Sequence, residues 1–208
     1  MKSDVNIIFD FDGTIADSFL LVMQKFNLLA DEFGFRCIDS TEIERVRNLP
    51  SNELIKYFRI PFYKLPKVLM RVRAMMREEM REIPLIPEMN AVVEALDGKG
   101  YRLTILSSNS AENILNWLQY HDMQTFFSGI EGKASYFGKV YSLKRLIRAN
   151  AMDRSDTYYV GDETRDIEAA RKCQIASVAV TWGFNSESAL SGFYPDFLVR
   201  KPEDLLGL

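Results

Sequence analysis

Short apolar runs that end in polar or glycine-rich turns recur along this chain, and they constrain its fold more than any other feature. They occupy residues 5–9, 103–106, 157–160 and 177–180. Continuous apolar runs of this length are typical of parallel strands buried on both faces. Helical patterns lie between the later runs, at residues 111–120, 140–149 and 165–173. Strands that alternate with helices predict an α/β protein with a doubly wound parallel sheet, in which ligands bind beyond the carboxyl ends of the strands.

Successive helical patterns interrupt this alternation from about residue 18 to residue 83. The prolines of the segment 83–87 disfavour a continuing helix and indicate a return linker. We therefore expect a Rossmann-like core of residues 1–15 and 85–208, with residues 16–84 inserted as an all-helical cap domain. The stop and start signals within the insert are Gly34, a possible capping box of Asp39 with Glu42, Pro50-Ser51, and Pro66 at a first helical position.

Composition excludes several classes of protein. The 208 residues are 47% hydrophobic and 26% charged, as in ordinary folded domains. With 26 Lys+Arg against 29 Asp+Glu, the net charge of -3 offers no bulk attraction to nucleic acid or to an anionic membrane. Two cysteines provide no disulfide framework, and no apolar run approaches the roughly 20 residues of a membrane helix. These features predict a cytoplasmic protein, with monomer and homodimer both left open.

Two aspartates stand directly after the first apolar run, in Asp10-Phe11-Asp12-Gly13-Thr14. Carboxylates this close together raise each other's pKa or require a divalent cation. Oxygen ligands with no histidine or cysteine nearby favour Mg²⁺ over Zn²⁺. Taken by itself, the segment is equally typical of a strand that ends in an ordinary Asp-Gly turn.

A second acidic cluster, Gly161-Asp162-Glu163-Thr164-Arg165-Asp166, follows the run at 157–160 and leads into a helical pattern. If the two strands are neighbours, Asp10, the Asp12 backbone carbonyl and Asp162 would coordinate one Mg²⁺. Asp166, one helical turn further on, would orient a ligand or a bound water, and Glu163 would share that task. Helix capping is the alternative interpretation for Asp162 and Asp166.

Groups suited to a phosphate follow two other parts of the pattern. The run at 103–106 ends in Ser107-Ser108-Asn109, which would offer a hydroxyl and backbone N–H groups at a helix N-terminus, with Ser110 as the cap. Lys139, after Phe137-Gly138 and before another helical pattern, would bring a positive charge to the same edge. A single lysine is more often simply solvated, so this feature has weight only beside the carboxylates.

In chain order, Asp-x-Asp-Gly-Thr, a serine at a strand end, a lysine and Gly-Asp-x-x-x-Asp resemble the four motifs of the haloacid dehalogenase-like hydrolase superfamily. The resemblance spans the whole core. The helical insert resembles a type 1 cap, and Thr181-Trp182-Gly183-Phe184 is similar to the phosphoglycolate phosphatase-like branch. The implied roles are Asp10 as nucleophile, Asp12 as general acid/base, Ser107 and Lys139 as phosphate and charge stabilisers, and Asp162 and Asp166 as metal-side carboxylates.

The lysine motif departs from the family pattern. It reads Phe137-Gly138-Lys139-Val140, without the proline that commonly follows the lysine in phosphoglycolate phosphatases. Lys133 is the competing candidate. Lys139 is preferred because it lies at a turn before a helix, where it would be aimed at the strand ends.

The residues and the resemblance together predict a phosphoric monoester hydrolase that uses Mg²⁺ and acts on a small phosphorylated metabolite through an aspartyl phosphate on Asp10. A carboxylate attacks phosphorus only when Mg²⁺ and Lys139 neutralise the charges that meet there. Asp12 favours phosphate over carbon–halogen chemistry, because a halide leaving group needs no proton. A sugar phosphomutase, or a catalytically weak binding or regulatory protein on the same fold, is the alternative.

Substrate contacts are expected from Thr14, Ser107, Ser108 and Asn109 in the core and from Arg47 in the cap. Three further arginines, Arg73, Arg77 and Arg81, recur at spacings of four near the end of the insert. This stripe is interpreted as a solvated helix face, with a grip on a polyanionic substrate as the alternative. The single histidine, His121, is expected to cap a helix end or lie at the surface.

Overall fold

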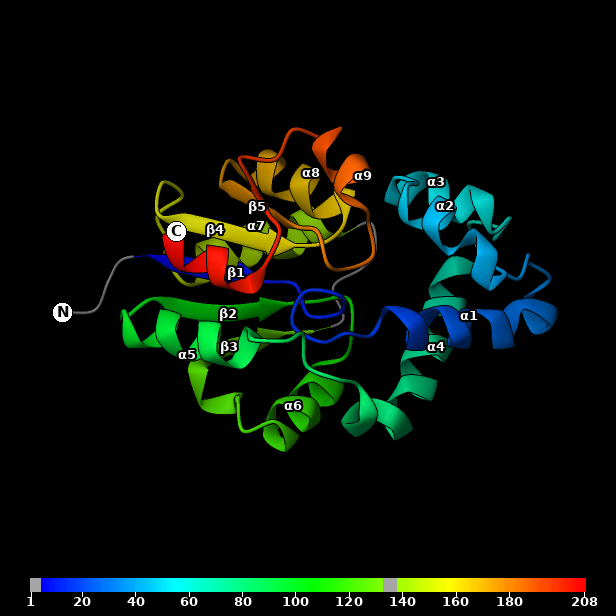
Figure 1. Cartoon of the computed structure of the whole chain (residues 1–208), viewed down its shortest axis with the longest axis horizontal. Helices are drawn as coiled ribbons and strands as arrows, with labels where there is room; N and C mark the ends of the chain where they lie inside the picture. The colour runs from blue at the N-terminus through cyan, green and yellow to red at the C-terminus, as the bar shows by residue number, and fades with distance from the viewer. Residues whose placement is uncertain (1–4, 133–137) are drawn as a thin grey trace.

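Six parallel strands form the sheet at the centre of the molecule, in the order β3-β2-β1-β4-β5-β6 (Figure 1). The computed structural model describes residues 5–132 and 138–208. All neighbouring strand pairs run parallel, so the predicted α/β class with a doubly wound sheet is confirmed. The strands are β1 (Asn6–Phe9), β2 (Arg102–Leu106), β3 (Phe127–Glu131), β4 (Thr157–Gly161), β5 (Ala176–Val180) and β6 (Phe197–Val199).

The four apolar runs of the sequence form the four central strands. The two edge strands, β3 and β6, were not predicted from the sequence. Of the five residues of β3, Phe127 is the buried one, and Val199 is the buried one of the three in β6. An edge strand leaves one side unpaired and needs no continuous apolar run. The pattern that identifies a doubly covered central strand is therefore missing from both.

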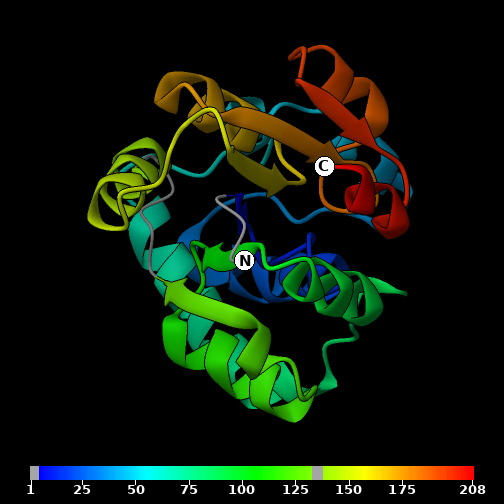
Figure 2. The same ribbon diagram turned by 90° about the vertical axis from the view of Figure 1, so that its left-hand side faces the viewer.

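Helices cover both faces of the sheet, and the alternation of side chains along β1 follows from this. Ile7 and Phe9 belong to the same apolar core as α5 (Met89–Gly98) and α6 (Ala111–Tyr120). Ile8 packs instead with α7 (Lys139–Ala149) and α8 (Thr164–Cys173). In Figure 2 these two pairs of helices lie on opposite sides of the sheet. The remaining elements of this part are η3 (Gln124–Phe126), α9 (Glu187–Ser191) and η4 (Pro202–Gly207).

The helical insert, residues 16–84, lies beyond the carboxyl ends of the strands (Figure 1). Among its described residues it contains no strand. Its apolar centre includes Phe26, whose ring packs against Phe35 and Phe58. Lys25 of α1 forms an ion pair with Glu79 of α4. Its elements are α1 (Phe19–Phe33), η1 (Ser40–Glu42), α2 (Ile43–Arg47), α3 (Ser51–Tyr57), α4 (Leu65–Glu79) and η2 (Met80–Glu82).

Most local signals read in the insert act as predicted. Gly34 ends α1 in a left-handed conformation with φ of 69°. Asp39 and Glu42 form the capping box, although it opens the short 3₁₀ segment η1. Pro66 is the second residue of α4, one position later than expected, because the helix begins at Leu65.

The two chain segments that connect the insert to the core run side by side. The Asp17 amide donates to the Pro84 carbonyl at 2.8 Å, and the Ile86 amide donates to the Ile15 carbonyl at 3.0 Å. Ala16 and Leu85 form an antiparallel bridge between these bonds. The insert is thus attached through one narrow, paired connection.

None of the helices in the described part of the chain has both the length and the apolar content needed to span a bilayer.

Candidate active site

The carboxyl ends of β1, β2 and β4 meet at one edge of the sheet, and polar residues follow each of them. Phe9 at the end of β1 is in register with Ile105 of β2 and with Val160 of β4. The Asp10 amide continues the pairing by donating to the Val160 carbonyl at 2.8 Å. Asp10 and Asp162, which are distant in sequence, therefore lie beside each other.

Lys139 joins two carboxylates in the interior of this edge. Its Nζ atom lies 2.6 Å from Asp10 Oδ2 and also forms an ion pair with Asp166. All three side chains are at least 97% buried. Burial by itself lowers the pKa of Lys139, but the charges of Asp10 and Asp166 outweigh it and hold the pKa well above its ordinary value. Lys139 is therefore a fixed positive charge, while Lys133 lies outside the described residues.

Asp162 is the most enclosed of the acidic groups. It accepts hydrogen bonds from the Thr14 hydroxyl at 2.6 Å and from the Phe184 amide at 2.7 Å. A Cβ atom at Gly13 or at Gly183 would collide with its carboxylate, and Gly13 has a φ of +78°. Burial, reinforced by neighbouring carboxylates, raises the pKa of Asp162 well above its ordinary value.

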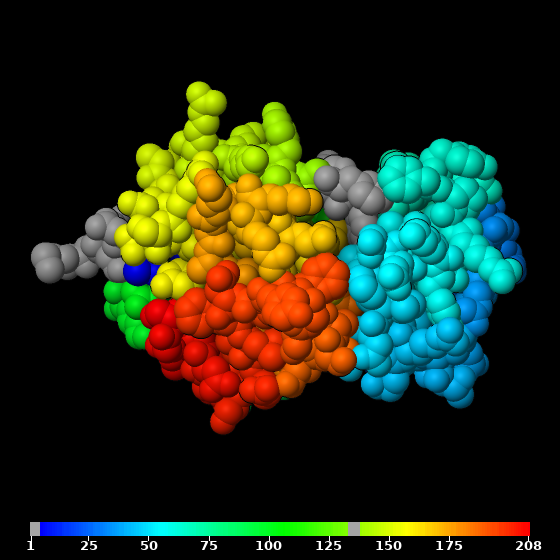
Figure 3. All heavy atoms as spheres, turned by 90° about the horizontal axis from the view of Figure 1, so that it is seen from above, coloured from blue at the N-terminus to red at the C-terminus, as the bar shows by residue number. Residues whose placement is uncertain are grey.

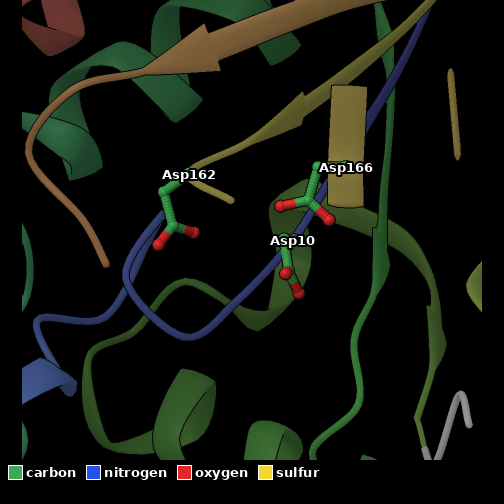
Figure 4. Close-up of side chains that lie close together, drawn as sticks. All are labelled: Asp10, Asp162 and Asp166. Carbon is green, nitrogen blue, oxygen red and sulfur yellow. The ribbon is translucent and has the colours of Figure 1, made fainter. Parts of the chain in front are cut away.

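Three carboxylates converge on a common point in this cluster. One oxygen from each of Asp10, Asp162 and Asp166 lies within 4.8 Å of the others, and Figure 4 shows the three side chains gathered at the strand ends. Burial raises the pKa of Asp166 to about 6 against the opposing charge of Lys139. Three buried carboxylates with a single buried lysine leave an excess of negative charge, and an all-oxygen donor set of this kind fits a divalent cation such as Mg²⁺.

Asp12 stands apart from that cluster. Its carboxylate accepts hydrogen bonds from the Asn109 side chain, with Nδ2 3.1 Å from Oδ2. Burial, and then the charge of Asp10, raise its pKa to about 6. A carboxyl with such a pKa exchanges a proton close to neutral pH, which suits general acid/base chemistry. The sequence analysis predicted that Asp12 contacts the metal through its backbone carbonyl. Its carboxylate lies outside the cluster of three and is available for proton transfer.

The predicted phosphate-binding residues after β2 lie as expected at the start of α6. Ser110 caps the helix by accepting from the Asn113 amide at 3.1 Å. The Ser107 hydroxyl accepts from the Asn109 amide at 3.1 Å, which fixes the tight turn between them. Ser108 and Asn109 line the pocket described below. Thr14 does not line it, because its hydroxyl faces Asp162.

A pocket with a volume of about 100 Å³ separates the strand ends from the insert. Asp10 and Asp12 lie at its floor beside Ser108 and Asn109. The insert supplies the opposite wall, which is apolar except for Arg73. The interpretation of the arginine stripe as one solvated face is therefore wrong for its first member. Arg77 and Arg81 are exposed as predicted, but Arg73 is half-buried, because the turn of α4 that carries it lies over the site.

Arg47 was predicted to contact the substrate, and the structure does not bring it to this pocket. Its guanidinium donates to the Gly183 carbonyl at 2.9 Å and lies over the ring of Phe19. The Arg47 carbonyl accepts from the Ser186 amide at 2.8 Å. Arg47 thus fastens the insert to the loop after β5. Figure 3 shows the cyan atoms of the insert in contact with the orange atoms of this loop.

One further residue of this contact, Asn185, was not found from the sequence. The Asn185 side chain donates to the Leu49 carbonyl at 2.9 Å and accepts from the Thr164 amide at 2.9 Å, so it links the insert to the start of α8. Glu163, predicted to assist at the metal, accepts instead from the Ser51 hydroxyl at 3.1 Å and pairs with Arg165. An asparagine in a loop has no sequence signal that would mark it as such a link.

The family described as haloacid dehalogenase-like hydrolase matches residues 7–180, and the chain belongs to this family.

Similar proteins place the chain within the family. It is 34% identical over 200 residues to a phosphoglycolate phosphatase of Synechococcus elongatus, covering 96% of this chain and 94% of that protein. It is 22% identical over 220 residues to the pyrophosphatase PpaX of Listeria monocytogenes, covering 97% and 94%. A haloacid dehalogenase-like family hydrolase of Streptococcus pneumoniae has the same fold, with a TM-score of 0.80 at 22% identity over 98% of this chain and 97% of that one. The chain is a hydrolase of the phosphoglycolate phosphatase-like branch of this family.

Proposed function

We propose that this enzyme is a Mg²⁺-dependent phosphatase that hydrolyses a small phosphate monoester through an aspartyl phosphate on Asp10. One observation carries the proposal: the Asp10 carboxylate stands at the floor of the pocket, held by Lys139 at 2.6 Å, with Asp12 two residues further on. Asp10, Asp162 and Asp166 would hold the metal ion, together with the Asp12 backbone carbonyl. When bound, the ion would neutralise the phosphoryl oxygens and the attacking carboxylate.

The protein groups divide the remaining work. Asp10 attacks phosphorus, and Lys139 holds its carboxylate in place while reducing the repulsion between two anions. Asp12 donates its proton to the leaving oxygen and later accepts one from the hydrolytic water, for which its pKa of about 6 is suitable. Asn109 fixes the Asp12 carboxylate, and Ser107 and Ser108 lie where the turn into α6 would receive phosphoryl oxygens.

Residues 16–84 are proposed as the cap that covers this site. The cap would exclude water during attack by Asp10 and would contact the leaving group, whereas the core would perform the chemistry. The insert is joined to the core through the paired connection at Asp17 and Pro84, and a small rotation about this connection would open the pocket.

A sugar phosphomutase remains the second candidate, and the character of the cap wall argues against it. A sugar phosphate would present several hydroxyl groups to a wall on which, in the described residues, Arg73 is the one polar side chain. Hydroxyl groups buried without hydrogen-bond partners are costly.

The test is a panel of phosphorylated metabolites, with and without Mg²⁺. Phosphoglycolate and pyrophosphate come first, as the substrates in the names of the two relatives, followed by sugar phosphates and p-nitrophenyl phosphate. We expect inorganic phosphate as the product and loss of turnover after dialysis against EDTA. Product analysis that finds an isomeric sugar phosphate would favour the mutase, and full turnover in EDTA would overturn the metal assignment.

The aspartates of the first motif provide the mechanistic test. Asp10→Asn is expected to be inactive in both half-reactions. Asp12→Asn keeps the nucleophile and loses about 100- to 10,000-fold in rate, with partial rescue by an ester that has a good leaving group. Mass spectrometry of the quenched Asp12→Asn reaction should find phosphate on Asp10. Phosphate on another residue, or near-normal turnover by Asp10→Asn, would overturn the proposed nucleophile.

A further inference from the structure

Among the described residues, Arg73 is the one charged side chain that the insert contributes to the wall of the pocket. Its side chain is half-buried on α4 and lines the pocket together with Asp10 and Asp12. Among the residues that the structure describes, no carboxylate lies within ion-pair distance of its guanidinium. Burial lowers the pKa of Arg73, and the negative charge of Asp12 acts in the opposite direction. The guanidinium therefore interacts electrostatically with a carboxylate on the pocket floor.

Other cations near the site already have anionic partners. Arg165 lines the same pocket and forms an ion pair with Glu163, which also accepts a hydrogen bond from Ser51 of the insert. Lys139 is occupied by two aspartates. Arg77, one turn further along α4 than Arg73, pairs with Glu112 at 2.8 Å. A partly desolvated and unpaired arginine is unfavourable unless an anion arrives to meet it.

The rest of the cap wall limits what that anion can be attached to. The other side chains that the insert contributes to the pocket are apolar, among them Val22, Leu54 and Met76. The pocket volume is about 100 Å³, and a cavity of about 150 Å³ accommodates benzene. The space between the phosphoryl site and the cap therefore fits a leaving group of a few heavy atoms and rejects a polyhydroxylated one.

Resting on the phosphatase function proposed above, we propose that Arg73 determines specificity by pairing with a second anionic group on the leaving side of a short phosphate substrate. A carboxylate and a second phosphate offer the same oxygen acceptors to a guanidinium. The apolar wall around Arg73 would strengthen this pairing, because water is excluded from it. Substrates that lack the second anion would leave Arg73 unpaired in the closed pocket.

Three substrates of similar size test this assignment. Phosphoglycolate carries a carboxylate, pyrophosphate carries a second phosphate, and 2-hydroxyethyl phosphate carries a neutral hydroxyl at the corresponding position. We would measure kcat and KM for each with saturating Mg²⁺, using the unmodified chain, Arg73→Met and Arg73→Lys. Arg71→Met is the matched control, because Arg71 lies on the same helix and is exposed.

The expected result is a loss of selectivity. Arg73→Met should lower kcat/KM by about 10- to 100-fold for the preferred anionic substrate, and by less than about threefold for 2-hydroxyethyl phosphate. Arg73→Lys should keep part of the preference because it keeps the charge, and Arg71→Met should behave as the unmodified enzyme. Comparison of phosphoglycolate with pyrophosphate identifies which anion the pocket takes. Thermal unfolding of each variant confirms that the fold is retained, and Arg73→Lys serves as the test if Arg73→Met unfolds.

Three outcomes would overturn the inference. An equal loss on all three substrates would mean that Arg73 acts through Asp12 or through the fold. Unchanged selectivity in Arg73→Met would remove it from the substrate site. The inference alone would fail if the unmodified enzyme hydrolysed p-nitrophenyl phosphate but preferred neither anionic substrate. If the enzyme hydrolysed no phosphate ester, the proposed function would fail as well.

Discussion

Lys139 and Asp10 form a buried ion pair across 129 positions of sequence, with Nζ 2.6 Å from Oδ2. The pair connects the end of the first strand to the start of α7, and Asp166 extends it into α8. One positive charge thus links three separate elements and offsets two carboxylates that would otherwise repel each other. Its removal has consequences for stability as well as for turnover.

Lys139→Met should be inactive and less stable. Loss of one partner of a buried ion pair leaves the other charge uncompensated, at a cost of about 3–5 kcal/mol in the free energy of unfolding. Urea denaturation measures this cost. Lys144→Met is the control, since Lys144 is exposed on the same helix. Equal stability of the two variants would show that the pair contributes little to the fold.

Thr14→Val should weaken the binding of Mg²⁺. The substitution removes the hydroxyl that donates to Asp162 at 2.6 Å while keeping the side-chain volume. Loss of a hydrogen bond that orients a metal ligand typically lowers metal affinity by about 10- to 100-fold. Calorimetric titration with Mg²⁺ measures the affinity directly, and the rise of Tm with Mg²⁺ measures it through linkage. Thr104→Val removes a buried hydroxyl from β2 and should leave the affinity unchanged.

Arg47→Ala should loosen the cap without changing which substrate is preferred. The variant loses the charged hydrogen bond to the Gly183 carbonyl, which contributes about 1.5–3 kcal/mol to the closed contact. We expect kcat/KM to fall by a similar factor for every substrate, in contrast to Arg73→Met. Arg45→Ala, on the exposed side of the same short helix, is the control. A change in the order of substrate preference would contradict this account and would indicate that Arg47 contacts the substrate.

Asp196 should make the folded state sensitive to acid. Its carboxylate accepts from the hydroxyl and the amide of Ser177, and these hydrogen bonds lower its pKa below the ordinary value of 3.8. A depressed pKa in the folded state means that the stabilisation is fully present above the unfolded value and is lost as the pH falls through the folded value. Asp196→Asn should therefore be less stable than the unmodified chain at pH 7, and the difference should shrink below about pH 4. A constant difference from pH 7 to pH 3 would contradict this account.

The sequence predicts which residues gather at the strand ends better than it predicts what encloses them. Asp10, Asp12, Asp162 and Lys139 each stand at the end of a strand or the start of a helix, and parallel strands bring such positions together by topology alone. Thr14 differs from them because its place after the strand does not determine where its hydroxyl points, and that hydroxyl donates to Asp162. Which side of Thr14 faces the pocket depends on packing that no local pattern encodes.

The cap illustrates the same limit. Helical periodicity places Arg73, Arg77 and Arg81 on one stripe, and the structure keeps the spacing of the first two on α4. The periodicity does not show that Arg73 faces the pocket while Arg77 and Arg81 reach solvent. That division depends on how the insert is docked, which Arg47 and Asn185 fix through carbonyl groups on the opposite chain segment. Every residue has a backbone carbonyl, so the sequence does not show which carbonyl a side chain will contact.

The paired connection at Asp17 and Pro84 would allow the insert and the core to change independently in evolution. Because the chain leaves and re-enters the core at adjacent points joined by a 2.8 Å hydrogen bond, a different helical segment could be exchanged there without altering the register of the sheet. Mutations that retune recognition on α4 leave Asp10 and Lys139 untouched. Descendants of such a protein can diversify what they accept while inheriting an unchanged reaction.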